Sequence, residues 1–425
     1  MNQRENSITP VTEGTCEWLL ENTLYMKWLS DRQGMVWIRG LPGAGKSTLL
    51  KYALKHHPKN DSSLYRDLII KFFFNGQGAE TEKSPEGLYR ALLHQLFRQF
   101  PGAFAELSEA YNGTATLNQW SWDTQELQEF LRLGMPRVLE QNPVWIFVDA
   151  LDECGQSSAN EVVTALGVLQ KSCNSAKQKL GICFSCRDYP VIRPDNCVSI
   201  RVDQYNNKDI ATYTRTRLRS ELGNDSDSLA LEQDIVSGSR GMFQWASLVV
   251  SNLIQLHIEG TPLKQLKKII ETTPPKLYDV YREIFTNLSK RHGLAASLKL
   301  FQCLWACEKM LTVEELRSVM NIEPEKECGS LEQFLDRPEY IDTDALMLKQ
   351  IRSLGGGLVA VVDLELSSDE SDTIASITEA DDEVEGWTLH VRLSHQSVWD
   401  FLIADGFRIL DPTLNTYELI DAKSE

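Results

Sequence analysis

The chain has 425 residues, more than a single hydrophobic core usually organises, so two to four domains are expected. Apolar residues make up 42 %, as in folded soluble proteins, and the formal net charge is −17. A chain this acidic has no global attraction to nucleic acid or to an anionic membrane surface, so neither is expected as a partner. No apolar run approaches the roughly 20 residues of a membrane helix.

Nine cysteines are scattered along the chain, and the N-terminus lacks the apolar segment of a signal peptide. An odd count without a leader favours reduced thiols and a cytoplasmic location. Cys183 and Cys186 form a C-x-x-C, a spacing seen in zinc and redox sites. Their run, LGICFSC, is apolar and no second C-x-x-C accompanies it, so core packing is preferred over metal binding.

Residues 1–30 are expected to form a lead and a helix. The first dozen residues are polar and are expected to be loose, and a helical pattern covers residues 14–29. A short apolar run at residues 35–39 then predicts the first strand of a folded domain.

A phosphate-binding loop follows that strand, because Gly40, Gly45, Lys46 and Ser47 fit G-x-x-x-x-G-K-[ST]. The glycines let backbone amides turn toward phosphate oxygens, and a predicted helix over residues 46–55 adds the positive end of its dipole. Lys46 is expected to reach the β- and γ-phosphates and Ser47 to bind Mg²⁺. The predicted nucleotide-binding residues of the loop are Gly40, Pro42, Gly43, Ala44, Gly45, Lys46, Ser47 and Thr48. The alternative is a glycine-rich turn with a surface lysine.

Three carboxylates follow a buried strand predicted over residues 144–149, in the stretch VWIFVDALDEC. Asp149 ends the strand, where parallel sheets place their ligands, and is expected to hold Mg²⁺ opposite Ser47. One of Asp152 and Glu153 is expected to position or deprotonate the attacking water, although both fit solvated loop acids as well. Arg187, after a strand at residues 180–185, fits a sensor of the γ-phosphate or a surface charge.

Strands at residues 68–74 and 198–202 alternate with helical patterns at 85–100, 124–139 and 160–172. This alternation predicts a parallel three-layer α/β sheet over residues 31–205. Residues 111–122 break the periodicity and are expected to form a loop.

Helical patterns dominate residues 206–275, where Phe243 and Trp245 lie on an apolar face and favour core packing over base stacking. Residues 276–405 contain a helix with TVEELRSVM and two strands, in GGGLVAVVDLEL and WTLHVRLSH. The three glycines suit the turn into the first strand better than a phosphate cradle. Residues 366–386 are rich in acids and are expected to be a disordered excursion, with a regulatory site as the alternative. Residues 406–425 are expected to be a tail without a compact element.

These motifs together resemble the NACHT module of STAND-class ATPases, in the nephrocystin-type branch abundant in filamentous fungi. The likeness rests on WIRGLPGAGKSTLLKYAL, IFVDALDEC and ICFSCRDYP, and continues through GMFQWASLVV, LTVEELRSVM and LSHQSVWDFL. It implies a P-loop NTPase sheet of order 5-1-4-3-2, a helical lid, a winged helix, and flanking effector and repeat domains. It also implies that His395 contacts the β-phosphate of ADP. From the residues alone, His395 is a capping or core histidine.

The resemblance implies a signalling switch of the NLR-like type. ADP would keep a closed monomer, ATP would open it to an oligomer, and slow hydrolysis would reset it. Two other functions fit the P-loop: a turnover kinase or NTPase, and a nucleotide-binding scaffold without hydrolysis. Ala150 stands where ABC and motor ATPases carry a glutamate, which disfavours the turnover enzyme.

Overall fold

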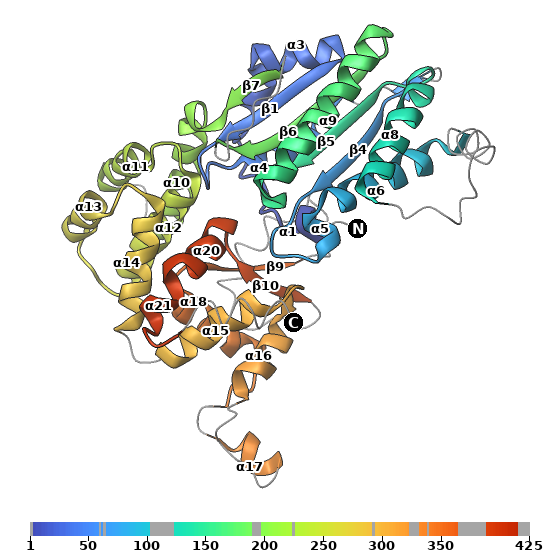
Figure 1. Cartoon of the computed structure of the whole chain (residues 1–425). Helices are drawn as coiled ribbons and strands as arrows, with labels where there is room; N and C mark the ends of the chain where they lie inside the picture. Colours follow the sequence, from blue (N-terminus) through green and yellow to red (C-terminus); the bar gives the residue numbers. More distant parts are fainter. Residues whose placement is uncertain are drawn as a thin grey trace. The chain divides into compact units, whose positions relative to one another are not determined.

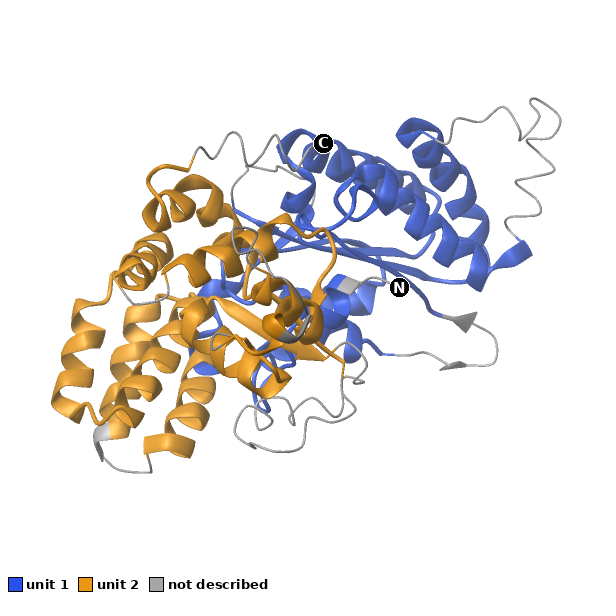
Figure 2. Cartoon of the chain, turned by 90° about the horizontal axis from the view of Figure 1, so that it is seen from below, with its two compact units in different colours: residues 1–209 blue, residues 210–425 orange. Residues whose placement is uncertain are grey.

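A computed structural model describes the chain in two compact units, residues 1–209 and 210–425 (Figures 1 and 2). The described residues are 3–58, 61–62, 65–102, 123–188, 197–222, 226–290, 294–322, 331–337, 340–363 and 388–414. The predicted loop at 111–122 and the acidic excursion at 366–386 lie outside them.

The first unit is built on a five-stranded parallel sheet of order β4-β5-β6-β1-β7. Counted along the chain, this is 2-3-4-1-5, which is the predicted order 5-1-4-3-2 taken from the opposite edge. The predicted P-loop NTPase sheet is therefore confirmed. Its strands are β1 (Gly34–Gly40), β4 (Leu68–Phe73), β5 (Val144–Asp149), β6 (Leu180–Arg187) and β7 (Cys197–Arg201).

Helices cover both faces of this sheet, which gives the predicted three layers (Figure 1). Helices α6 (Pro85–Gln99), α8 (Thr124–Leu139) and α9 (Gln156–Ser175) pack on one face. Helices α3 (Thr23–Asp31) and α4 (Lys46–Lys55) pack on the other. Side chains alternate along β6, so Cys183 is buried in one core layer and Cys186 in the opposite one. The C-x-x-C cysteines are therefore part of the core packing.

The shorter elements of this unit are α1 (Gln3–Ser7), α2 (Trp18–Glu21), β2 (Asp61–Ser62), β3 (Tyr65–Arg66), α5 (Glu80–Lys83), η2 (Leu151–Cys154) and η3 (Val202–Gln204).

Two expectations for the N-terminal segment were wrong. The single helix over residues 14–29 is split into α2 and α3, because the Asn22 side chain accepts the amides of Leu24 and Tyr25 and caps α3. Among the first dozen residues, residues 3–8 are not loose either. They contain α1, and the side chains of Ser7 and Ile8 are buried.

The second unit combines helices with a small antiparallel sheet of order β8-β10-β9. The predicted hairpin strands are present, with Leu393 paired to Val359 and Leu389 to Asp363. The strands are β8 (Leu311–Thr312), β9 (Val359–Asp363) and β10 (Leu389–Leu393). The helices are α10 (Asn207–Leu222), which starts in the first unit, α11 (Ser226–Ser239), α12 (Phe243–Ile258), α13 (Leu263–Thr272), α14 (Leu277–Ser289), α15 (Leu294–Ala306), α16 (Val313–Asn321), α17 (Leu331–Leu335), α18 (Asp344–Gly355), α20 (Gln396–Phe401), a π-helical turn (Leu402–Gly406) and α21 (Phe407–Leu410).

Several sequence expectations are met in this unit. Trp245 is buried, and its indole N–H donates to the Pro274 carbonyl at 2.7 Å, so it belongs to the core. Gly356 and Gly357 both have positive φ and form the turn between α18 and β9. The expected tail differs, because Phe407 and Leu410 are buried in α21. Within the described parts of the chain, no helix combines the length and the apolarity needed to cross a membrane.

His57 is an unusual member of the core of the first unit. It is 3 % exposed, and its ring stands edge-on to Trp145 at 4.5 Å between centroids. Neither ring nitrogen has a hydrogen-bond partner among the described residues. Burial lowers the pKa of His57 to about 4, and the nearby Arg32 guanidinium adds to this shift.

This burial predicts a pH-dependent stability. Below about pH 6.5, the unfolded chain protonates His57 while the folded chain does not, so stability falls as the pH drops from 6.5 toward 4. Between pH 7.5 and pH 5 the wild type should lose about 2 kcal/mol more than His57→Phe. Urea unfolding followed by tryptophan fluorescence measures this difference. Equal losses in the two proteins would contradict it.

Candidate nucleotide-binding site

The P-loop connects β1 to α4 with the geometry of an anion cradle. Gly43 and Gly45 have φ of +72° and +94°, which a side-chain-bearing residue adopts only with strain. A Cβ added to Gly45 would meet nothing within 4 Å, so the loop faces open space there. Ala44, within the loop, is buried, and Ser47 and Thr48 lie in the first turn of α4. The positive end of the α4 dipole therefore lies at this loop.

Lys46 lies folded back on this loop. Its Nζ donates to the Gly40 carbonyl at 3.1 Å and to the Leu41 carbonyl at 2.9 Å. Burial lowers the pKa of the Lys46 ammonium, and the Asp152 carboxylate opposes that shift. An incoming phosphate would offset the same desolvation, which is how a P-loop lysine binds a nucleotide. The alternative of a surface lysine is excluded by these contacts.

Two residues beyond β7 support the loop, and neither was predicted from the sequence. Asp203 Oδ1 accepts the Leu41 amide at 3.2 Å, and the Asn206 side chain donates to the Ala44 carbonyl at 2.9 Å. A Cβ on Gly40 would approach Asp203 Oδ1 to 2.5 Å, so this glycine allows the close contact. Because about 160 residues separate the partners, only the parallel placement of β7 beside β1 could reveal them.

Asp149 ends β5 as a fully buried carboxylate. Its Oδ1 accepts the Ser185 hydroxyl at 2.5 Å, and Ser185 Oγ in turn accepts the Ala150 amide at 2.8 Å. Its Oδ2 is buried with no hydrogen-bond partner among the described residues. Burial raises the pKa of Asp149, whereas the hydroxyls of Ser185 and Ser47 and the Arg4 guanidinium lower it. The fold thus places Ser47 beside Asp149 across the loop, the arrangement expected for a shared cation.

Asp152 and Arg187 form a partly buried ion pair at the ends of β5 and β6. Asp152 Oδ2 lies 2.9 Å from Arg187 Nε, and Asp152 Oδ1 accepts the Arg187 amide at 3.0 Å. The Asp152 side chain is only 7 % exposed, so it is not a solvated loop acid. Arg187 is not a plain surface charge either, since its guanidinium is paired at the site.

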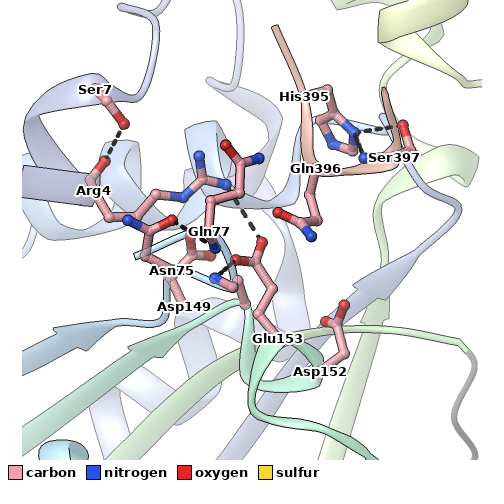
Figure 3. A network of polar contacts seen from close by, with 12 residues as sticks. Arg4, Ser7, Asn75, Gln77, Asp149, Asp152, Glu153, His395, Gln396 and Ser397 are labelled. Carbon is pink, nitrogen blue, oxygen red and sulfur yellow. Dashed lines mark hydrogen bonds and ion pairs between the residues drawn. The ribbon is translucent and has the colours of Figure 1, made fainter. Parts of the chain in front are cut away.

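Glu153 is the other buried acid of η2, and its two oxygens have different partners. Oε2 accepts the Gly76 amide at 2.7 Å, and Oε1 lies 3.5 Å from Arg4 Nη2. Figure 3 shows the Arg4 side chain reaching toward Glu153 beside Asn75 and Gln77. Burial raises the pKa of Glu153 to about 7, while Arg4 acts to lower it. A carboxylate poised near neutral pH suits proton transfer.

His395 lies in the second unit, where it caps α20. Its Nδ1 accepts the Ser397 amide at 3.0 Å and contacts the Ser397 hydroxyl at 2.7 Å, as drawn in Figure 3. The Ser397 hydroxyl is also 2.8 Å from the Tyr281 hydroxyl. An Nδ1 that accepts a hydrogen bond leaves the proton of the neutral ring on Nε2. The capping histidine expected from the residues alone is therefore present.

The residues of the first unit fit a magnesium–nucleotide. Ser47 and Asp149 would supply two oxygen ligands, since the buried Oδ2 of Asp149 has no hydrogen-bond partner among the described residues and a cation or donor would satisfy it. The described residues contain no cluster of three His, Cys, Asp or Glu able to hold a metal on their own. Phosphate oxygens would complete the coordination, as is usual for Mg²⁺.

Comparison with known families agrees with this site. The family described as "Nephrocystin 3, N-terminal" matches residues 14–187. Residues 14–187 are a nephrocystin-type NACHT domain. The NACHT resemblance inferred from the sequence is thereby confirmed, and the P-loop of this domain implies that it binds a nucleotide, typically with Mg²⁺.

A curated relative extends the similarity beyond the NACHT domain. The chain is 21 % identical over 354 residues to the vegetative incompatibility protein HET-E-1 of Podospora anserina. The match covers 76 % of this chain and 25 % of the relative, so the chain spans about a quarter of that protein's length. Together with the family match, this likeness supports a NACHT-type, fungal NLR-like protein.

Solved structures resemble the chain only distantly. Drosophila ORC bound to DNA matches at 12 % identity and a TM-score of 0.38, covering 94 % of this chain and 90 % of the other. ORC1 of Aeropyrum pernix in complex with DNA has a TM-score of 0.37 at 12 % identity, covering 96 % and 97 %. A Walker-type ATPase of Pyrococcus abyssi has a TM-score of 0.38 at 12 % identity, covering 94 % and 99 %.

The hydrogen bond from the Leu41 amide to Asp203 predicts what removing the Asp203 carboxylate would do to stability and nucleotide binding. Asp203→Ala leaves the Leu41 amide without its acceptor, which should destabilise the protein by about 1–3 kcal/mol and weaken nucleotide binding. Asp203→Asn keeps an acceptor oxygen and should lose less than half as much. Urea unfolding and titration with a fluorescent ADP analogue measure both effects. If the alanine variant matched the asparagine variant in both assays, Asp203 would not support the loop.

Proposed function

We propose that the NACHT domain binds Mg²⁺–ATP and Mg²⁺–ADP between the P-loop and the end of β5. This proposal rests on Asp149 Oδ2, which is buried and has no hydrogen-bond partner among the described residues. The Ser47 hydroxyl lies next to the same carboxyl group. The Lys46 ammonium would replace its hydrogen bonds to two loop carbonyls with hydrogen bonds to phosphate oxygens. Pro42, Gly43 and Thr48 would line the remaining path of the phosphates.

We propose further that the domain hydrolyses ATP slowly, with Glu153 as the residue that activates water. Both Asp152 oxygens are engaged by Arg187, one by its side chain and one by its backbone. Glu153 keeps one neutral backbone donor and one ion-pair partner at 3.5 Å, and its pKa lies near 7. Glu153 is therefore better suited than Asp152 to accept a proton at physiological pH. Arg187, held by Asp152, would act on the γ-phosphate.

The remaining step is a switch between two states. Residues 31–205 would form the nucleotide-binding domain, residues 206–275 a helical lid, and residues 276–405 a winged helix. In the ADP state His395 would donate its Nε2 hydrogen to the β-phosphate and keep a closed monomer. ATP would favour an open form that associates with itself or with flanking effector and repeat domains. A nucleotide shifts such an equilibrium only by its differential affinity for the two states.

Replacing His395 tests the switch. His395→Asn keeps a good helix N-cap but removes the imidazole, so α20 should stay folded while ADP dissociates at least tenfold faster. The variant should also form oligomers at a lower ATP concentration than the wild type. Stopped-flow release of a fluorescent ADP analogue and light scattering measure the two effects, with His390→Ala as the matched histidine control. Unchanged ADP release from a monomeric His395→Asn protein would rule out the phosphate contact.

A further inference from the structure

The first helix of the chain brings a cation into the candidate site. Arg4 lies on α1, and its guanidinium is 3.5 Å from the Glu153 carboxylate. The two side chains are only 13 % and 5 % exposed, so this is a buried pair rather than a surface contact. The charge of Arg4 acts on Asp149 as well as on Glu153, lowering the pKa of both carboxyls. Neither the P-loop nor the NACHT match, which begins at residue 14, includes this arginine.

Four contacts hold α1 and its arginine in place. Glu5 forms an ion pair with Lys71 of β4, and Lys51 of α4 donates to the Ile8 carbonyl at 3.2 Å. The Ser7 hydroxyl donates to the Arg4 carbonyl at 2.8 Å, and Ile8 is packed into the core layer that contains α4. The segment is thus attached both to the helix that starts at the P-loop and to a strand of the sheet. A side chain carried on such a support is preorganised.

Glu153 has few other partners that fix its position. Its Oε2 accepts the Gly76 amide, which follows β4, and Asp152 is the neighbouring acid of the same turn. Repulsion from Asp152 and burial both favour a neutral Glu153, which cannot accept a proton from water. The Arg187 guanidinium, which is paired with Asp152, also lowers the pKa of Glu153 but acts less strongly than Arg4. Arg4 is the strongest charge acting to keep Glu153 ionised.

From this geometry we propose that Arg4 is a positioning residue for ATP hydrolysis. Its guanidinium orients the Glu153 carboxylate through Oε1, while the Gly76 amide holds Oε2, so the acid faces the attacking water as a base. The N-terminal segment is then part of the working site. This inference rests on the proposed role of Glu153 in hydrolysis.

The test combines substitutions of Arg4 and Glu153 in the full chain. Arg4→Gln should lower the single-turnover rate of ATP hydrolysis at least tenfold while the Kd for ADP changes less than threefold. Arg4→Lys should restore part of the rate, because it keeps a cation near the carboxylate. Glu153→Gln should lower the rate at least tenfold alone, and Arg4→Gln added to it should cost less than a further twofold. Arg132→Gln removes the same charge from an exposed pair with Glu129 and is the matched control.

The outcomes separate the two proposals. If the wild type neither binds nor hydrolyses ATP, or if Glu153→Gln hydrolyses at the wild-type rate, the proposed function of the site fails. If Glu153→Gln is slow but Arg4→Gln matches the wild type, or if the two effects multiply, Arg4 does not position Glu153. Loss of ADP binding in an Arg4→Gln protein that unfolds at the wild-type temperature would also overturn the proposal, because it would make Arg4 a binding residue.

Discussion

A buried carboxylate with one unsatisfied oxygen is the constraint on which this structure depends. Asp149 is fully buried at the end of β5, and only its Oδ1 is hydrogen-bonded within the described residues. An unpaired charge in such a position is costly unless a cation or donor joins it. The P-loop lies across from it with Lys46 and Ser47 at the start of α4. The sheet order places the Asp149 carboxylate next to the P-loop. A magnesium–nucleotide would compensate both charges, because Mg²⁺ would pair with the carboxylate and the phosphates with the Lys46 ammonium.

The support for this arrangement comes from the whole length of the first unit. Asp203 and Asn206 hold the P-loop from beyond the last strand, and Arg201 holds Asp203 at 2.9 Å. At the other end of the unit, Arg4 reaches Glu153. A site assembled from both ends of a unit forms only when that unit is fully folded. Nucleotide binding and folding of this unit are therefore thermodynamically linked.

The sequence predicts those parts of the site that have a local pattern. The P-loop motif, helix α4 at residues 46–55 and strand β5 at residues 144–149 have the predicted bounds, because glycine spacing and apolar runs are local signals. Arg4 was missed because its segment is short and polar, and the residues that anchor it to the sheet and to α4, Lys71 and Lys51, lie far away in the sequence. The helix expected over residues 14–29 was wrong because one side chain, Asn22, caps a new helix inside an apolar pattern. The pairing of Asp152 with Arg187 is likewise absent from any local signal, since it joins two strand ends.

If Lys46 and Asp149 hold an adenine nucleotide with magnesium, the purified full chain should carry that nucleotide, and its nucleotide content can be measured. The protein is denatured, and the released nucleotide is separated by chromatography and quantified. We expect close to one ADP or ATP per wild-type chain and less than a tenth of that for Lys46→Ala. A wild-type chain that releases no nucleotide, and that does not bind ADP or ATP at millimolar concentration with Mg²⁺, would contradict it.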